Sequence, residues 1–395
     1  MTSFATGLLG YGTIELIESG TGGAARLINE GQIIPQLGGT LEIINTGSGD
    51  GGVDLDGNTG DGVLDVHDGN NLTGNRLLVT APLSDTTLNG PIYLGSNDVL
   101  EITSAWSLAD TAVLQVLDTG PGTLRGGAIT QTTGNTIDVT AGATLVFEAP
   151  FTMTGGDLAN SGTVVFAANS TIGAGANFTM PTASSSITVE PGVTVNVDQA
   201  NFDADGSDTV SNVITIRAGG ILDLDLGTGG DDVLRGTIRL NGGELDVTTA
   251  NDNWRIDGAG SALVGAETGT SQINGDPVRV GNPVTVGANA TLDINASGFV
   301  WGGGADIAAG TVLRHDGDVE FDGSGPITGG GELAINAGSN VSSNQSINVA
   351  LFNWDGTDGS LDSHMIAAGA TLTINSPNFD SDGVMHDNVT NSFSD

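Results

Sequence analysis

The stretch Ala288-Asn289-Ala290-Thr291-Leu292-Asp293-Ile294-Asn295, followed by Phe299 and Trp301, decides the fold of this chain. Small residues open it, apolar residues then alternate with polar ones, and aromatics follow. Alternation with a period of two is typical of a β-strand with one buried face. The phrase returns along the chain as Val99-Leu100-Glu101-Ile102 with Trp106, Thr144-Leu145-Val146-Phe147 with Phe151, Val193-Thr194-Val195-Asn196-Val197 with Phe202, Glu244-Leu245-Asp246-Val247 with Trp254, Ile347-Asn348-Val349 with Trp354, and Thr371-Leu372-Thr373-Ile374 with Phe379.

The aromatics after these phrases are spaced in a near-regular series. They stand at positions 106, 151, 202, 254, 301, 354 and 379. The spacing between neighbouring aromatics is in most cases close to twice the spacing of the last pair, 354 and 379. The series indicates a unit of about 25 residues, and such a unit cannot bury its own apolar face, so units have to stack. We therefore predict an all-β parallel β-solenoid (β-helix) of roughly 25-residue coils, about 16 in all, with the aromatics as core residues at one place in the phrase, immediately after its inward-facing strand.

Composition supports many short strands joined by tight turns. The 395 residues include 64 Gly, while aromatic residues are 4% and charged residues 14%. The 38% of hydrophobic residues in regular alternation is too much for a disordered chain. Residues 1–75 are interpreted as N-terminal coils or a cap with an acidic loop, and residues 76–395 as a continuous solenoid.

The charge balance excludes several classes of partner. The formal net charge is −38, from 47 acidic and 9 basic residues, and every basic residue is an Arg. Nucleic acid is excluded because its phosphates require cations on the protein, and no apolar run is long enough for a membrane span. Uncompensated carboxylates repel one another in the folded state, which divalent cations or high salt would relieve, and such an acidic chain suits a Ca²⁺-rich external medium.

Catalytic signatures are missing from the sequence. There is no Cys, which excludes disulfides and thiol chemistry. The histidines are scattered, none has the spacing of a metal site, and we predict them at the surface or in turns: His67, His315, His364 and His386. No nucleophile elbow or phosphate loop is present, so we predict that the protein is not an enzyme.

The phrases Gly142-Ala143-Thr144-Leu145-Val146-Phe147 and Ala368-Gly369-Ala370-Thr371-Leu372-Thr373-Ile374-Asn375 resemble the repeats of large bacterial surface proteins. These are the autotransporter passengers and the filamentous-haemagglutinin-like adhesins. The resemblance covers residues 90–390 and is one of style more than of lineage. It implies a secreted β-helical stalk, adhesin or matrix protein in an extracellular location at the bacterial cell surface.

One acidic loop resembles a Ca²⁺-binding loop. Asp54, Asp56 and Asn58 fit positions 1, 3 and 5 of the EF-hand loop, Asp61 lies within it, and Asp65 stands at position 12. Thr59 stands where the EF-hand needs Gly, and no helices flank the loop. The alternative is an acidic turn between strands.

Further acidic turns are candidate Ca²⁺ sites. Residues 227–236, with Asp231 and Asp232, resemble one nonapeptide of the calcium-binding β-roll, a family that needs tandem copies. Other turns pair an aromatic with aspartates, and stacked carboxylates would repel without cations; the candidates are Asp203, Asp205, Asp208, Asp380 and Asp382. Asp and Gly are also ordinary turn formers, so both readings stay open.

Three functions fit these patterns. The first is a non-enzymatic extracellular structural or adhesive protein that binds a surface glycan or protein. The second is a carbohydrate-active β-helix, such as a tailspike-like depolymerase or a polysaccharide lyase, in which exposed tryptophans would stack on sugars: Trp106, Trp254, Trp301 and Trp354. The third is a self-assembling filament or surface-layer subunit.

Overall fold

The computed structural model describes the chain apart from residues 1, 5–6, 18–24, 47–51, 58–61, 68–73, 183, 199–211, 228–232, 235, 250–253, 257–261, 265–268, 276–277, 282–283, 297, 324, 337, 355–362, 382–383 and 388–395. Within the described residues all 49 regular elements are β-strands and none is a helix. Strands pair in parallel with strands one coil away, as β18 (Thr144–Phe147) does with β21 (Thr163–Phe166). The predicted all-β parallel β-solenoid is confirmed, and no described segment forms a helix able to cross a membrane.

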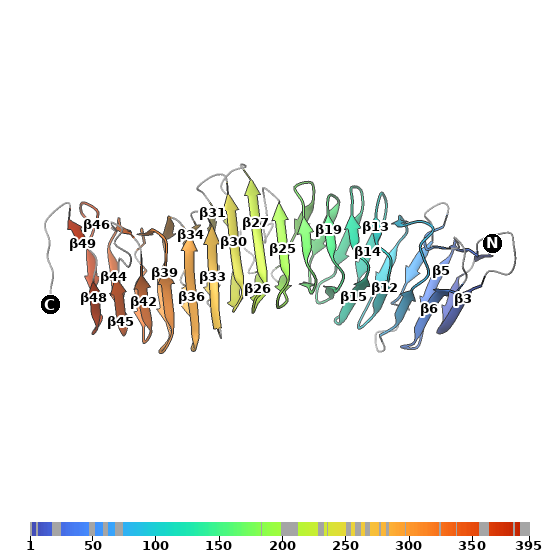
Figure 1. Ribbon diagram of the computed structural model, residues 1–395, viewed down its shortest axis with the longest axis horizontal. Coiled ribbons are helices and arrows are strands. Elements are labelled where there is room, and N and C mark those ends of the chain that lie inside the picture. The colour runs from blue at the N-terminus through green and yellow to red at the C-terminus, as the bar shows by residue number, and fades with distance from the viewer. Residues whose placement is uncertain are drawn as a thin grey trace. The chain divides into compact units, whose positions relative to one another are not determined.

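The chain divides into two compact units, Met1–Thr188 and Val189–Asp395. In each unit a coil comprises three short strands, and equivalent strands stack on three faces (Figure 1). We call them the first, second and third faces, in the order in which the chain reaches them after Gly7; the third face of the first unit holds two separate sheets.

The first unit contributes these strands. The first face consists of β2 (Leu8–Gly10), β5 (Gln32–Pro35), β8 (Val63–Asp65), β11 (Ile92–Leu94), β14 (Val113–Val116), β17 (Thr136–Val139), β20 (Asp157–Asn160) and β23 (Asn177–Thr179). The second face consists of β3 (Gly12–Leu16), β6 (Thr40–Asn45), β9 (Arg76–Val79), β12 (Val99–Ile102), β15 (Pro121–Gly126), β18, β21 and β24 (Ser186–Val189). The third face consists of β1 (Thr2–Phe4), β4 (Leu27–Asn29) and β7 (Val53–Asp54), then β10 (Thr87–Leu88), β13 (Trp106–Leu108), β16 (Ile129–Gln131), β19 (Phe151–Met153) and β22 (Ser170–Ile172).

The second unit repeats the same order of faces. Its first face consists of β28 (Val233–Leu234), β31 (Trp254–Ile256), β34 (Val278–Val280), β37 (Phe299–Trp301), β40 (Val319–Phe321), β43 (Ser339–Val341), β46 (Ser363–Ile366) and β49 (Val384–Asp387). Its second face consists of β26 (Val213–Arg217), β29 (Thr237–Asn241), β32 (Ala262–Val264), β35 (Val284–Val286), β38 (Ala305–Ile307), β41 (Ile327–Gly329), β44 (Gln345–Asn348) and β47 (Leu372–Ile374). Its third face consists of β25 (Thr194–Asp198), β27 (Ile221–Gly227), β30 (Glu244–Thr249), β33 (Gly269–Gly275), β36 (Ala290–Ala296), β39 (Val312–His315), β42 (Glu332–Ile335), β45 (Leu351–Trp354) and β48 (Phe379–Ser381).

Alternation within each strand separates the core from the surface. In β12, Leu100 and Ile102 are buried, whereas Val99 and Glu101 are partly exposed. Because the strands stack in register, buried residues form columns inside the coil, and burial of each Leu or Ile stabilises the fold by roughly 1.5–3 kcal/mol. One such column on the second face runs through Leu77, Leu100, Leu124, Phe147 and Phe166.

Each copy of the repeated phrase forms a strand, but different copies lie on different faces of the coil. The phrases at Val99 and Thr144 form β12 and β18 on the second face, whereas those at Glu244 and Thr291 lie in β30 and β36 on the third. The aromatics do keep their place just after the phrase, because Trp106 and Phe299 each begin the strand that follows it, but that strand lies on the third face for Trp106 and on the first face for Phe299. Each coil holds three strands with the same alternation, and the coil length varies, because Leu100 pairs with Leu124 whereas Leu145 pairs with the nearer Val164.

The expectation that the repeat aromatics are core residues is confirmed wherever their side chains are described. At most 3% of the surface of each is exposed in the set Trp106, Phe151, Phe299, Trp301 and Trp354. Phe202 and the side chains of Trp254 and Phe379 lie outside the described residues. Phe147 stacks on Phe151 and Phe166 with ring centroids 4.2 and 5.6 Å apart, so aromatic columns add to core packing.

Corners between faces need unusual backbone. Asn97, Asp110 and Asp118 adopt φ angles of 63°, 51° and 67°, in the left-handed region that Asn and Asp tolerate better than other side chains. A Cβ added to Gly323 would lie 2.1 Å from the carbonyl oxygen of Gly302, one coil earlier. Glycine at this corner therefore lets neighbouring coils approach.

Candidate functional site

Outward side chains on the third face of the first unit form a column of hydroxyls. Register places the members side by side in successive coils: Thr87, Ser107, Thr130, Thr152 and Thr171. Strand spacing sets them about 4.8 Å apart. The column is a regular polar strip with no charge of its own.

A second column, on the second face of the same unit, alternates in charge through Glu101, Arg125 and Glu148, and Arg76, which is in register with Val99, reaches Glu101 diagonally. The Arg76 Nη2 atom lies 2.7 Å from Glu101 Oε2, and Arg125 Nη1 lies 3.7 Å from the same oxygen. The Arg125 Nε atom donates to Glu148 Oε2 at 2.5 Å, and this bond raises the pKa of the Arg125 guanidinium. Each charge in this column therefore faces an opposite one.

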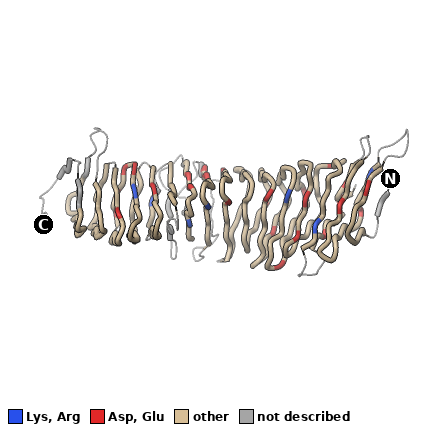
Figure 2. Tube along the Cα trace, turned by 60° about the horizontal axis from the view of Figure 1, so that its bottom comes forward, with Lys and Arg blue, Asp and Glu red and all other residues tan. Residues whose placement is uncertain are grey.

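The third face of the second unit carries a column of acids and amides. Its members in successive coils are Asn196, Asp223, Asp246, Asn274 and Asn295. Burial raises the pKa of the Asp223 carboxyl, and the charges of Asp246 and Asp225 raise it further. Acidic positions greatly outnumber basic ones in the described residues (Figure 2).

Asp293 lies in the same strand as the last member of this column, beside one basic residue. Arg314 Nη1 is 3.7 Å from Asp293 Oδ2. Burial raises the pKa of the Asp293 carboxyl, Asp316 raises it further by its charge, and Arg314 lowers it. One guanidinium thus only partly offsets two carboxylates.

The candidate Ca²⁺ loop forms a corner between the third and first faces of the first unit. Asp54 ends β7, and Asp56, in the following turn, is only 3% exposed. Asp56 Oδ2 accepts from the backbone N–H of Asn89 at 2.8 Å, and Asp54 Oδ1 accepts from the N–H of Gly57 at 2.8 Å. Burial raises the pKa of the Asp56 carboxyl to about 6; the Asn89 bond lowers it, and Asp54 and Asp85 raise it.

The other predicted metal residues are not brought into this corner by described structure. Asp65 lies in β8 on the first face, beside Tyr93. Asp380 lies in β48, its side chain outside the described residues. Wholly outside those residues are Asn58, Asp61, Asp203, Asp205, Asp208, Asp231, Asp232 and Asp382. Among described residues, no group of three or more His, Cys, Asp or Glu side chains is arranged to hold a metal ion.

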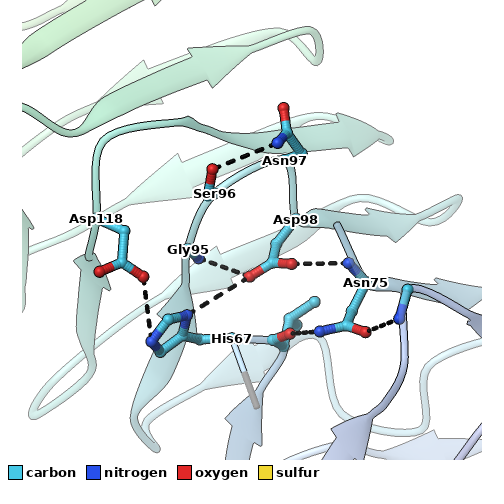
Figure 3. A network of polar contacts seen from close by, with 9 residues as sticks. His67, Asn75, Gly95, Ser96, Asn97, Asp98 and Asp118 are labelled. Carbon is cyan, nitrogen blue, oxygen red and sulfur yellow. Dashed lines mark hydrogen bonds and ion pairs between the residues drawn. The ribbon is translucent and has the colours of Figure 1, made fainter. Parts of the chain in front are cut away.

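A polar network ties together successive corners between the first and second faces (Figure 3). His67 Nε2 lies 3.3 Å from Asp118 Oδ2, and its Nδ1 lies 4.0 Å from Asp98 Oδ2. The buried Asp98 accepts from the backbone N–H groups of Asn75 and Gly95, both at 2.7 Å. With both carboxylate oxygens of Asp98 engaged, the network holds three coils in register.

His315 is a core residue, so its predicted surface or turn location is wrong. It is 1% exposed, and its Nε2 accepts a hydrogen bond from Trp301 Nε1 at 2.9 Å. Burial lowers the pKa of the His315 imidazole to about 3, so the ring is neutral. The alternation Val312-Leu313-Arg314-His315 puts His315 inward with Leu313, a signal that the sequence did contain.

A shallow cleft opens on the first face of the second unit. Its volume is about 290 Å³, and its polar lining includes Asp318, Glu320 and Asn340 beside the exposed Met365. No described tryptophan lines it.

Comparisons with known proteins add no relative to this picture: no family model, no curated protein and no solved structure matches the chain.

Proposed function

We propose that this chain is a non-enzymatic structural or adhesive repeat protein of the bacterial cell surface or its extracellular matrix. The observation that carries the proposal is the set of outward polar columns, above all the five-coil hydroxyl column from Thr87 to Thr171. A strip with a constant repeat can make the same contact many times with a repeating polymer, so that weak contacts add. Surface glycans and fibrous proteins are such polymers.

Burial of the tryptophans supports this proposal over the carbohydrate-active alternative. Trp106, Trp301 and Trp354 are 3%, 0% and 1% exposed. Side chains so enclosed cannot stack on a sugar ring, because stacking needs an open aromatic face. They act instead as core residues, and Trp301→Ala is expected to cost about 3–5 kcal/mol of stability.

Adhesion under flow tests the proposal. The purified chain, fixed to beads, is expected to hold to surfaces coated with bacterial polysaccharide or matrix protein. Thr130→Lys with Thr152→Lys interrupts the hydroxyl column and should lower the detachment force several-fold. The control changes Thr136 and Thr163 to Lys on the other two faces. Shortening of the polysaccharide by the chain would instead support the carbohydrate-active alternative.

Exposed apolar residues in the first two coils favour self-assembly as a second candidate. Leu9, Tyr11 and Leu37 are 56%, 66% and 72% exposed, and Tyr11 lies against Gly39. Contiguous patches of such side chains mark interaction sites. Light scattering should show concentration-dependent association that Leu9→Lys with Tyr11→Lys abolishes; a monomer at all concentrations would contradict this candidate.

A further inference from the structure

We propose that the corner formed by Asp54, Asp56 and Asn89 binds one hard divalent cation of the Ca²⁺ class. This set differs from the EF-hand-like set expected from the sequence, because Asn89 comes from the next coil. The cation would thus link two successive coils of the first unit.

Two enclosed oxygens point to a ligand. Asp56 Oδ1 and Asn89 Oδ1 are both shielded from solvent and have no hydrogen-bond donor among the described residues. Burying an acceptor without a partner is costly, and for a carboxylate the cost is greater. A cation satisfies several such acceptors at once, since carboxylate and amide oxygens are the ligands that Ca²⁺ takes.

Charge at the corner supports the same assignment. Asp54 and Asp56 take part in none of the ion pairs found between described residues, and Asp85 adds a third negative charge nearby. The second oxygen of Asp56 is fixed by Asn89, whose backbone N and Nδ2 lie 2.8 and 3.2 Å from it. The carboxylate is therefore held in place and cannot swing into solvent to relieve its burial.

A proton shared by Asp54 and Asp56 is the competing occupant. It would neutralise one carboxyl, but it would leave the Asn89 amide oxygen without a partner. Asp56→Asn mimics the protonated acid and so separates the two cases.

The test measures Ca²⁺ binding and local protection in the full chain. Protein freed of metal is titrated with CaCl₂ by calorimetry, and hydrogen exchange is followed at residues 53–57 and 87–89 with and without Ca²⁺. We expect Ca²⁺ to slow exchange at both segments and to raise the melting temperature. Asp56→Asn should weaken this site at least tenfold and Asn89→Ala several-fold.

The control is Asp138→Asn, an outward residue of β17 that changes the net charge equally. It should leave Ca²⁺ binding and the protection at both segments unchanged. Circular dichroism and melting in chelator establish that each variant folds. The proposal is overturned if Ca²⁺ protects neither segment of the unaltered chain, or if Asp138→Asn reduces protection as much as Asp56→Asn does.

Discussion

The two units build the same three-stranded coil but balance its charges differently. In the first unit, the outward charges from Arg76 to Glu148 alternate in sign, with nitrogen–oxygen distances from 2.5 to 3.7 Å. In the second unit, Asp223 faces Asp246 with only amides beyond them. The cores differ too, because the first unit stacks Phe rings and the second encloses the polar His315.

The difference shows that the backbone hydrogen bonds, which are shared by both units, do not determine the charges in the outward side-chain columns. Parallel register places neighbouring positions of a column about 4.8 Å apart in either unit. Whether those neighbours attract or repel is decided by residue type alone. The response of each unit to pH and salt should therefore follow its columns, and four experiments can break or sharpen this contrast.

The largest expected effect is acid destabilisation of the second unit through His315. Its folded pKa of about 3 lies below the unfolded value of 6.5, so below pH 6.5 the unfolded state binds the extra proton. Stability is lost as the pH falls from 6.5 toward 3, by about 2 kcal/mol at pH 5. Hydrogen exchange, corrected for intrinsic rates, should show this in β39 and less in β18. His315→Gln retains an acceptor for Trp301 and should remove this loss; an equal loss in that variant would refute the assignment.

Reversal of one charge in the alternating column should have the next largest effect. Glu101→Arg would place a guanidinium between those of Arg76 and Arg125 and should lower the free energy of unfolding by about 1–2 kcal/mol, since exposed pairs contribute up to about 1 kcal/mol each. Chemical denaturation measures the loss. Glu101→Gln removes the attraction without adding repulsion and should cost about half as much. Equal stability of both variants would show that the column contributes no net attraction.

A smaller change of opposite sign is expected in the acid and amide column. Asp246→Asn should stabilise the second unit by about 0.5 kcal/mol at pH 7, because it removes a like charge beside Asp223. The folded pKa of Asp223 is raised, so the folded state binds the extra proton and gains stability as the pH falls through that pKa. The benefit of Asp246→Asn should therefore shrink in acid. Asn196→Asp adds a carboxylate to the same column and should destabilise, as urea titration at pH 7 would show.

Salt should have the smallest effect, and its sign should differ between units. Raising NaCl from about 0.05 to 0.5 M shortens the screening length and weakens all exposed charge pairs. We expect a loss of a few tenths of a kcal/mol in the first unit and a similar gain in the second. Local exchange rates at β12 and β30 report the two units separately. A change of the same sign in both would argue against column-specific electrostatics.

The sequence predicted the fold because strand alternation is local. Leu100 and Ile102 needed only the period of two to be placed inward, and the turn-rich composition required short strands. The three faces could not be predicted, because phrases such as those at Thr144 and Thr291 look alike yet lie on different faces. The partner of Asp56 was missed for a similar reason. Asn89 lies far along the chain, and the pairing depends on the length of an intervening coil that the sequence does not mark.

Between residues 312 and 347, neighbouring coils have the same length on all three faces. Val312 pairs with Glu332, Val319 with Ser339 and Ile327 with Ile347, so the residue number advances by the same step on all three faces. Loss or duplication of a segment of that length anywhere in this run would turn no side chain from the inside to the outside. Each remaining strand would meet a neighbour of its own face, and contacts in such arrays reach only the next repeat. A gene for this protein can thus be lengthened or shortened by one whole coil in a single in-frame event, and natural variants should differ here by whole coils.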